Sequence, residues 1–395
     1  MGSIAISDPK RCSGCRACEQ VCPHNCITMQ RDAEGFHYPQ VDTTRCTQCG
    51  LCERVCPFLH PAPPRKPLRI SALQAVEEHL RTNASSGGLF YLLAEQTLQR
   101  GGVVFGAGFD AQWRVCHQQA RTIEEVQALT TSKYVQSDTA DTFRAVKRLL
   151  GEGVEVLYVG TPCQIAGLRA FLARPHENLL LVDFICHGVP SPAVWEHYLN
   201  YRTARLGWQI GEITHISFRD KRKGWRNYSL TLRAGEQEYS APMKSEPYLR
   251  GFQENLYLRP SCSACKAKRF RSGSDLTLSD FWNIRRYLPE WDNDRGSSLL
   301  HICTEKGLRR LEGLNCQRSD LQHYRYQEMA YSSITLHPKR KGFFEGLTRG
   351  EEFDTLVAKL LKKRPFARQL KQLRKLITRL KHRHENCYTD PTATL

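Results

Sequence analysis

The chain has 395 residues, 41% hydrophobic and 25% charged, and its formal net charge is +17. This length allows two or three domains with buried cores, and the composition excludes a disordered or fibrous chain. No run of about 18 apolar residues predicts a membrane span, and residues 1–10 lack the apolar segment of a signal peptide, so we expect a cytoplasmic protein.

The positive charge is concentrated in a tail. Eleven Lys or Arg residues and no Asp or Glu lie between Lys359 and Arg383, which leaves +6 for the rest of the chain. We therefore expect no general affinity for nucleic acid.

Two copies of the pattern C-x-x-C-x-x-C-x-x-x-C-P open the chain. In such a copy three thiolates hold one iron-sulfur cube, and the fourth ligates the cube of the other copy. We expect one 4Fe-4S cluster on Cys12, Cys15, Cys18 and Cys56, and another on Cys46, Cys49, Cys52 and Cys22. Zinc ribbons use two cysteines per knuckle, so the pattern favours clusters over zinc or disulfides. Cys26 falls outside the pattern, and we predict a small buried residue there.

This pattern is similar to that of bacterial two-cluster ferredoxins. The resemblance implies an α+β ferredoxin-like domain, to which we assign residues 1–60. Residues 61–67 read as a stiff proline-rich linker.

Mixed α/β structure is predicted from Leu68 onward. An amphipathic pattern over 89–99 indicates a helix that stops at Gly101, a buried strand follows at 103–105, and a helix is predicted over 141–150.

A βαβ unit is predicted from 155 to 185. A strand at 156–160, a helix at 165–172 and a strand at 179–185 form a crossover whose strands must be parallel. Cys163 and Cys186 then lie beyond the carboxyl ends of these strands, where open α/β sheets place their ligands.

Two further cysteines, Cys262 and Cys265, form a C-x-x-C pair among basic residues. If this loop folds over the carboxyl edge of the sheet, four thiols converge and satisfy a third cluster. The alternative is that Cys163 and Cys186 are small buried residues and that the pair is half of a zinc knuckle. The remaining cysteines are predicted to be structural: Cys116, Cys303, Cys316 and Cys387.

Two glycine-containing segments suggest phosphate binding. Small residues from Ser85 to Gly88 open a helix, so free N–H groups could face a phosphate, although an ordinary N-cap explains them equally well. The segment from Gly106 matches the dinucleotide fingerprint, but a predicted strand over 113–118 replaces the required helix, so we reject it.

Seven motifs in order resemble the coenzyme F-420 hydrogenase/dehydrogenase beta-subunit family. They begin at Ser85 (SSGG), Ser132 (SKYVQS), Val159 (VGTPCQI), Asp183 (DFICHGVPS), Phe218 (FRDK), Arg259 (RPSCSAC) and Ser279 (SDFW). The resemblance implies an FAD-binding α/β domain with a partly parallel sheet and its own 4Fe-4S cluster. We assign residues 68–320 to it and residues 321–395 to a basic helical C-terminal extension.

The motifs supply the residues expected to bind FAD: Ser85, Ser86, Gly87, Gly88, Ser132, Lys133, Tyr134, Gln136, Thr161 and Gln164. Lys133 is a catalytic candidate because a cation near N1 of a reduced flavin raises its potential; a solvated lysine is the alternative. His187 could protonate a substrate or bond a backbone carbonyl. The basic loop from Arg219 to Trp225 could meet an anionic substrate or an acidic partner, or form a solvated turn.

We therefore expect a reductase that takes electrons from ferredoxin or another low-potential donor and passes them to an unidentified substrate. One alternative is the electron-transfer beta subunit of an F-420-linked hydrogenase or dehydrogenase complex. Another is a non-enzymatic redox sensor or scaffold. An apolar stripe over 366–380 within the basic tail predicts a docking helix, whose partner would be its own body, a second copy, an acidic protein or an anionic membrane surface.

Overall fold

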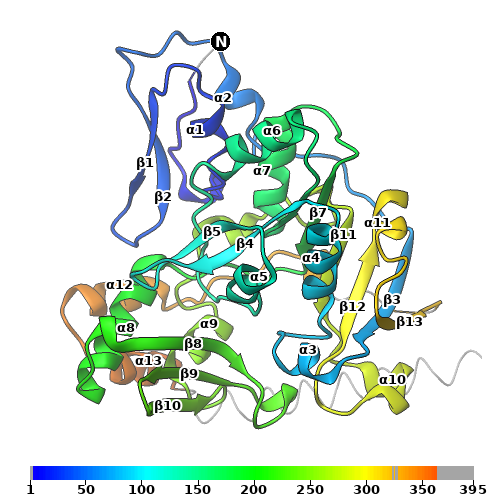
Figure 1. Ribbon diagram of the computed structural model, residues 1–395. Helices are drawn as coiled ribbons and strands as arrows, with labels where there is room; N and C mark the ends of the chain where they lie inside the picture. Colours follow the sequence, from blue (N-terminus) through cyan, green and yellow to red (C-terminus); the bar gives the residue numbers. More distant parts are fainter. Residues whose placement is uncertain (1–2, 323, 325–327, 363–395) are drawn as a thin grey trace, which may run out of the picture.

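The computed structural model describes residues 3–322, 324 and 328–362, which form an N-terminal module seated on a larger α/β body (Figure 1). The module contains an antiparallel hairpin and two short helices. Their bounds are α1 (Ala17–Val21), β1 (Ile27–Arg31), β2 (His37–Val41) and α2 (Leu51–Arg54). The two helices begin at equivalent places of the two cysteine patterns.

A left-handed residue precedes each of these helices. Gly50 takes this conformation in the second copy with φ 73°, and Arg16 takes it in the first with φ 61°. A non-glycine residue pays a conformational penalty there. Ion pairs of Arg16 with Glu19 at 2.7 Å and Asp138 at 2.5 Å offset that cost and fix the module to the body.

The segment between module and body has no regular structure but is bonded to the body. The Arg65 amide donates to the Arg269 carbonyl oxygen at 3.0 Å, and the Leu68 amide donates to that of Ile302 at 2.7 Å. The proline-rich connector is therefore laid along the body before it enters the main sheet.

The main sheet has eight strands in the order β13-β3-β12-β11-β7-β6-β4-β5. Their bounds are β3 (Arg69–Ala75), β4 (Val103–Phe109), β5 (Val115–Ala120), β6 (Val156–Val159), β7 (Leu179–Phe184), β11 (Leu276–Asp280), β12 (Ser298–Ile302) and β13 (Cys316–Asp320). Strands β4, β6, β7 and β11 are parallel, and the outer strands pair antiparallel. The predicted α/β domain with a partly parallel sheet is confirmed.

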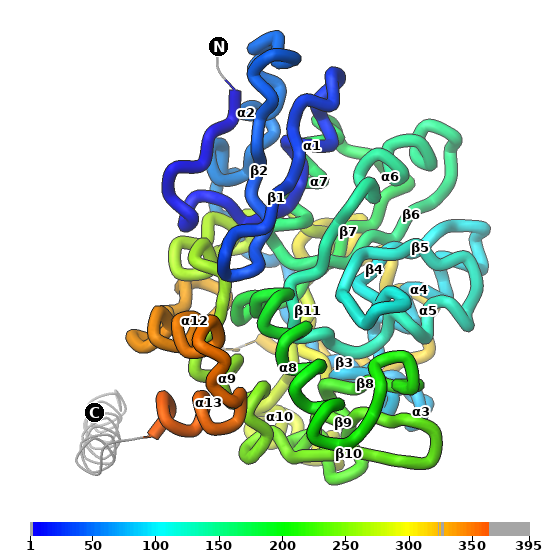
Figure 2. Tube along the Cα trace, turned by 90° about the vertical axis from the view of Figure 1, so that its left-hand side faces the viewer, coloured from blue at the N-terminus to red at the C-terminus, as the bar shows by residue number. Residues whose placement is uncertain are grey.

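Helices cover both faces of this sheet. Alternate residues of one strand enter different cores: Phe105 packs with α6 and α7, and Val104 packs with α4 and α5. These helices are α4 (Leu89–Gln99), α5 (Ile123–Leu129), α6 (Thr142–Gly151) and α7 (Pro162–Leu172). The N-terminal module lies on the α6–α7 side, where α1 packs against both helices (Figures 1 and 2).

The helices and strands predicted in this region agree closely with the structure. Helix α4 has the predicted bounds, and β6, α7 and β7 form the predicted crossover with parallel strands. The strand β5 follows the rejected dinucleotide fingerprint, as expected.

A second hydrophobic core lies beside the main sheet. A three-stranded antiparallel sheet in the order β10-β9-β8 packs with four helices around buried aromatic residues, including Trp195 and Tyr248 (Figure 2). The bounds are α8 (Pro192–Leu206), β8 (Ile213–Asp220), β9 (Ser229–Ala234), β10 (Gln237–Pro242), α9 (Pro247–Gln253), α12 (Arg340–Thr348) and α13 (Phe353–Leu361). Phe343 and Phe353 are fully buried here, so α12 and α13 are built into the body.

The remaining short helices are α3 (Glu78–Thr82), α10 (Ile284–Tyr287) and α11 (Glu305–Arg309). Within the described ranges, no helix has both the length and the apolar character needed to cross a membrane. The apolar stripe predicted over 366–380 lies outside the described residues.

Candidate functional site

The first predicted set of thiols, Cys12, Cys15, Cys18 and Cys56, is brought together in the module. Burial raises the pKa of the Cys18 thiol well above its ordinary value, and the neighbouring charges of Cys15, Cys12 and Cys56 raise it further. Burial likewise raises the pKa of Cys15 to about 12. Bare thiolates are unfavourable here, whereas iron in place of the protons would neutralise them.

Three members of the second predicted set, Cys22, Cys46 and Cys52, lie close to Cys26. The Cys26 and Cys22 sulfurs lie 3.3 Å apart, and Cys46 is near enough to raise the pKa of Cys26 together with burial and Cys22. Cys52 packs in the same small cluster, and Cys49 is exposed. Cys26 is buried, as predicted, but its contact with the predicted ligand Cys22 was not expected from the cysteine pattern.

The third set of thiols also converges. Cys163 lies in the first turn of α7, and Cys186 follows β7. Cys262 belongs to the turn at Pro260–Ala264, and Cys265 comes directly after that turn. All four line one cavity at the carboxyl edge of the sheet. Burial is the main cause that raises the pKa of Cys163 to about 11 and of Cys262 to about 12.

The donor groups around all three sets fit an iron-sulfur cluster. One amide N–H donates to a sulfur in each set: Gly14 to Cys12 at 3.4 Å, Ile4 to Cys52 at 3.4 Å, and Val189 to Cys262 at 3.5 Å. Such bonds stabilise the negative charge of cluster sulfurs. In the part of the chain that is described, no group of three His, Cys, Asp or Glu side chains is placed to hold a single metal ion.

Arg259 joins the first and third sets. Its side chain is fully buried three residues before Cys262. It donates to the carbonyl oxygens of Cys12 and His37, both at 2.8 Å, and to Gln136 Oε1 at 3.0 Å. A Cβ atom at Gly14 would lie 2.8 Å from its Nη1, so only glycine fits there. One guanidinium thus fixes the first cysteine loop against the body.

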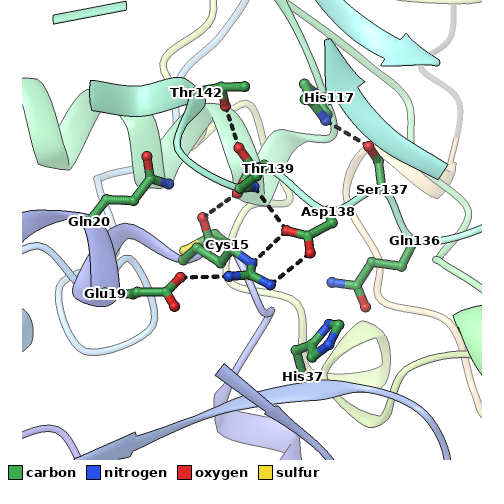
Figure 3. Close-up of polar contacts among 12 residues, drawn as sticks. Cys15, Glu19, Gln20, His37, His117, Gln136, Ser137, Asp138, Thr139 and Thr142 are labelled. Atoms are coloured by element: carbon green, nitrogen blue, oxygen red, sulfur yellow. Dashed lines mark hydrogen bonds and ion pairs between the residues drawn. The ribbon is translucent and has the colours of Figure 1, made fainter. Parts of the chain in front are cut away.

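A second group of contacts fastens the same loop (Figure 3). The Thr139 hydroxyl donates to the Cys15 carbonyl oxygen at 3.1 Å, and Gln136 Nε2 donates to that of Ser13 at 2.9 Å. Figure 3 shows Asp138 and Glu19 in the same network; Arg16 pairs with both.

The first and third sets are neighbours. Burial is the main cause that raises the pKa of the Cys15 thiol, and Cys163 is close enough to raise it further. A Cβ atom at Gly167, on α7, would lie 2.9 Å from Cys15 Sγ. Ser13 and Phe58 of the module line the cavity of the third set.

Comparisons with known proteins agree with this arrangement. Residues 11–59 match the 4Fe-4S dicluster domain, and residues 153–322 match the C terminus of the coenzyme F-420 hydrogenase/dehydrogenase beta subunit. Over residues 153–322 the chain is therefore similar to the F-420 hydrogenase/dehydrogenase beta-subunit family. All four thiols of the third set lie within the matched region.

A solved structure of the F-420-reducing nickel-iron hydrogenase complex from Methanosarcina barkeri contains a similar chain. It is 14% identical with a TM-score of 0.46, and the match covers 75% of this chain and 92% of that one. No curated protein sequence matches the chain.

The residues that the F-420 beta-subunit resemblance assigns to FAD divide into two groups. In the first, beside the amino end of α4, the Ser132 amide donates to Ser85 Oγ at 2.7 Å. Lys133 Nζ donates to the carbonyl oxygens of Ala128 and Thr130, and burial lowers the pKa of Lys133 to about 7.

The glycines of this group are constrained by packing. The Gly87 N–H donates to Ser298 Oγ at 3.0 Å, and a Cβ atom there would lie 2.4 Å from the Leu73 carbonyl oxygen. Ser86 Oγ donates to the Ser297 carbonyl oxygen at 2.6 Å, and Gly88 is left-handed with φ 88°. The Gly87 amide is therefore already used within the protein.

The second group lies near the third set of thiols. Gln164 accepts from Thr161 in a capping box that starts α7, and its Nε2 donates to the Ser137 carbonyl oxygen at 2.9 Å. Gln136 contacts the module, and Tyr134 stacks on Phe252. These contacts position α7 and Cys163.

His187 lines the cavity of the third set, and its ring packs edge-on against Phe252 at 5.1 Å. Burial lowers its pKa, which favours the neutral imidazole. The two catalytic candidates thus lie at different places: Lys133 beside the amino end of α4, and His187 in the cavity of the third thiol set.

Sequence reasoning missed that two residues of the basic loop are buried. Arg219 is 4% exposed and donates to Asp280 at 2.7 Å, and Lys221 Nζ donates to three carbonyl oxygens, including that of Ser86. Arg222, in contrast, is exposed and pairs with Asp220 and Glu238. Of Arg219, Lys221 and Arg222, only Arg222 therefore lies in a solvated turn.

Two tryptophans complete this region. Trp225 stacks on Trp282 with ring centroids 4.4 Å apart, and its Nε1 donates to the Ser85 carbonyl oxygen at 3.1 Å. Trp282 is 41% exposed and Phe184 is 38% exposed, so flat apolar surface is accessible there. Phe184 is the last residue of β7, and Trp282 follows β11, the parallel strand beside it. In the sequence, Phe184 belongs to the motif that begins at Asp183 and Trp282 to the motif that begins at Ser279, so these motifs already marked both residues.

Proposed function

We propose that this chain is an iron-sulfur flavoprotein reductase that receives electrons from ferredoxin or another low-potential donor and delivers them to an unidentified oxidised substrate. Both matched regions belong to proteins of electron transfer, and the family belongs to hydrogenases and dehydrogenases. The fit of the thiol sets to clusters supports the proposal.

The contact between the first and third thiol sets carries the proposal. Cys15 and Cys163 come from different parts of the chain, yet their thiols are neighbours across the α1–α7 contact. Thr139, Gln136 and Arg259 hold the Cys12–Cys15 loop in this position. A module that only stored electrons would not need this placement.

In the proposed third site, Cys163, Cys186, Cys262 and Cys265 would hold one more 4Fe-4S cluster. The Val189 amide donates to Cys262 Sγ, and Lys268 Nζ donates to the Cys186 carbonyl oxygen at 2.7 Å. Both groups bring positive charge or a donor to the thiolates and would stabilise their negative charge.

Ser85, Ser132, Lys133 and Lys221 would hold FAD beside the amino end of α4. When bound, FAD supplies the conversion between single electrons and a two-electron transfer that clusters alone cannot make. Buried cations fit an anionic group: Arg219 and Lys221 lie at this edge, and Lys221 is bonded to the Ser86 carbonyl oxygen. Trp282 offers an accessible flat surface beside Arg219.

A second candidate fits at least as well. The family match itself favours an electron-transfer beta subunit of a larger hydrogenase or dehydrogenase complex, which acts with other subunits. The two proposals differ in whether the isolated chain accepts electrons from reduced ferredoxin and turns over an acceptor.

The deciding experiment is anaerobic purification of the full chain with iron and flavin analysis. We expect about twelve iron atoms per chain and one FAD, and loss of about four iron atoms in Cys163→Ser. Reduced ferredoxin should then bleach the flavin of the isolated chain. Unbleached flavin would contradict the stand-alone reductase, absence of flavin would refute the flavoprotein, and absence of turnover with every two-electron acceptor would favour a sensor.

The basic tail, the compartment and self-association remain predictions from the sequence. Removal of residues 363–395 should abolish pelleting with anionic vesicles at low salt if the tail attaches the chain to a membrane. Equal pelleting of both forms would refute that attachment.

A further inference from the structure

A second cavity lies between the N-terminal module and the body, and it shares Phe58, Cys163 and Ala267 with the cavity of the third thiol set. It measures about 190 Å³ and is lined by the end of the module and the start of the linker, by one face of α7 and by the segment after Cys265. Its charged or titratable side chains are His60, Arg169, Lys266 and Arg271. The described residues that line it include no Asp or Glu.

These cations, of which Arg169 and Lys266 are exposed, lack the carboxylate partners that several other arginines of this chain have. Arg16, Arg202 and Arg340 each form an ion pair at short distance. In the described ranges no ion pair within 4.0 Å joins Arg169, Lys266 or Arg271 to a carboxylate.

The donor atoms in the cavity are also incompletely used. Arg271 Nε is buried without a hydrogen-bond partner among the described residues. Arg169 donates only from Nη1, to the Ser272 carbonyl oxygen at 3.2 Å. Burial, and then the charge of Arg65, lowers the pKa of Arg169, which means that its positive charge is poorly compensated.

The nearest acid is already engaged. Asp275 acts on Arg169 only at a distance. Its carboxylate accepts from Thr304 Oγ1 at 2.7 Å and from the Leu181 amide at 2.9 Å, and it pairs with Lys306 at 3.3 Å. No carboxylate of the described residues therefore neutralises the positive charge of the cavity, which leaves it open to an anion from outside the chain.

We propose that this cavity binds a small oxyanion of the phosphate or carboxylate class, held by Arg169, Lys266 and Arg271. Guanidinium groups match such oxyanions with paired hydrogen bonds, and the volume suits a phosphate or a small dicarboxylate rather than a nucleotide. The site is separate from the residues assigned to FAD, and its existence does not depend on the proposed reductase activity.

Binding there would affect the neighbouring thiol set. Cys163 forms part of the wall, so a bound anion adds negative charge beside one of the four proposed ligands. Negative charge near a cluster disfavours its reduction and so lowers its potential. Electron transfer between the first and third thiol sets would thereby depend on the concentration of the anion.

The test is calorimetric titration of the full chain, purified anaerobically, with inorganic phosphate and separately with succinate at constant ionic strength. We expect saturable binding of one of them to a single site. Arg169→Gln and Arg271→Gln should each weaken it at least about tenfold, the loss of one charge-assisted bond. Arg174→Gln is the matched control, because this exposed arginine follows the same helix outside the cavity and should leave binding unchanged.

Iron content and circular dichroism confirm that each variant is folded, and Arg271→Lys provides a second variant that keeps the charge. We expect it to bind more weakly than wild type and more tightly than Arg271→Gln. Absence of saturable binding to either probe, or equal weakening by Arg174→Gln, would overturn the proposal. A phosphate-dependent change in the paramagnetic resonance of the reduced third cluster is the second expected readout.

Discussion

At the scale of single residues, the junction between module and body depends on Arg259. It is the residue through which a cysteine loop of the module, the Gln136 side chain and the cysteine loop of the body meet. The guanidinium also lies over the rings of Phe36 and Tyr38, 5.3 and 4.5 Å from their centroids. Lysine could keep the charge there but could not make three bonds in one plane.

We predict that Arg259→Lys lowers the free energy of unfolding by about 2 to 4 kcal/mol, because two buried carbonyl oxygens and an amide lose a donor. Anaerobic denaturant titration measures this. Arg285→Lys is the control: that side chain is 78% exposed, so its change should stay below about 0.5 kcal/mol. If both substitutions lowered the free energy of unfolding by the same small amount, the planar guanidinium of Arg259 would not be needed.

At the scale of elements, the amino end of α4 is fixed by its packing against the main sheet. Gly87 sits where β3 and β12 approach, and a Cβ atom would meet two backbone atoms, the Leu73 carbonyl oxygen at 2.4 Å and the Ser298 nitrogen at 2.7 Å. Backbone atoms of a sheet cannot move aside as a flexible side chain can.

We therefore expect Gly87→Ala to destabilise the protein by more than about 2 kcal/mol. Gly342→Ala in α12 is the matched control, since a Cβ atom there would meet nothing within 4 Å. It should leave stability unchanged or raise it by up to about 1 kcal/mol, because alanine is the better helix former. Thermal unfolding of both variants decides; a tolerated Gly87→Ala would contradict the packing argument.

Local patterns predicted the elements well but not their assembly. The bounds of α4 follow from Gly88 and Gly101, and the capping box of Thr161 and Gln164 marks the start of α7. In contrast, β3 pairs with β12 and β13, more than 200 residues later in the chain, and no local pattern encodes such pairing. The burial of Arg219 could not be predicted from local sequence either, because its partner Asp280 is 61 residues away in the chain.

At the scale of the whole molecule, the order of the three thiol sets defines a path. The first set lies beside the third, and the exposed Cys49 belongs to the second set. The second set would then face an electron donor, and the first would lie at the contact between module and body. The third would lie at the carboxyl edge of the sheet, beside Phe184. Each step connects sets that are held by contacts within one chain.

This order predicts the magnetic coupling between reduced clusters. Coupling falls steeply with distance, so the third cluster should be broadened mainly by the first. In anaerobic paramagnetic resonance, Cys15→Ser should narrow the signal of the third cluster, because its neighbour is lost. Cys49→Ser should leave that broadening in place, because the second set is not its neighbour. Iron analysis of each variant confirms which cluster was removed. If Cys49→Ser narrowed the third signal while Cys15→Ser left it unchanged, the second set would be the neighbour of the third, and the path across the α1–α7 contact would be wrong.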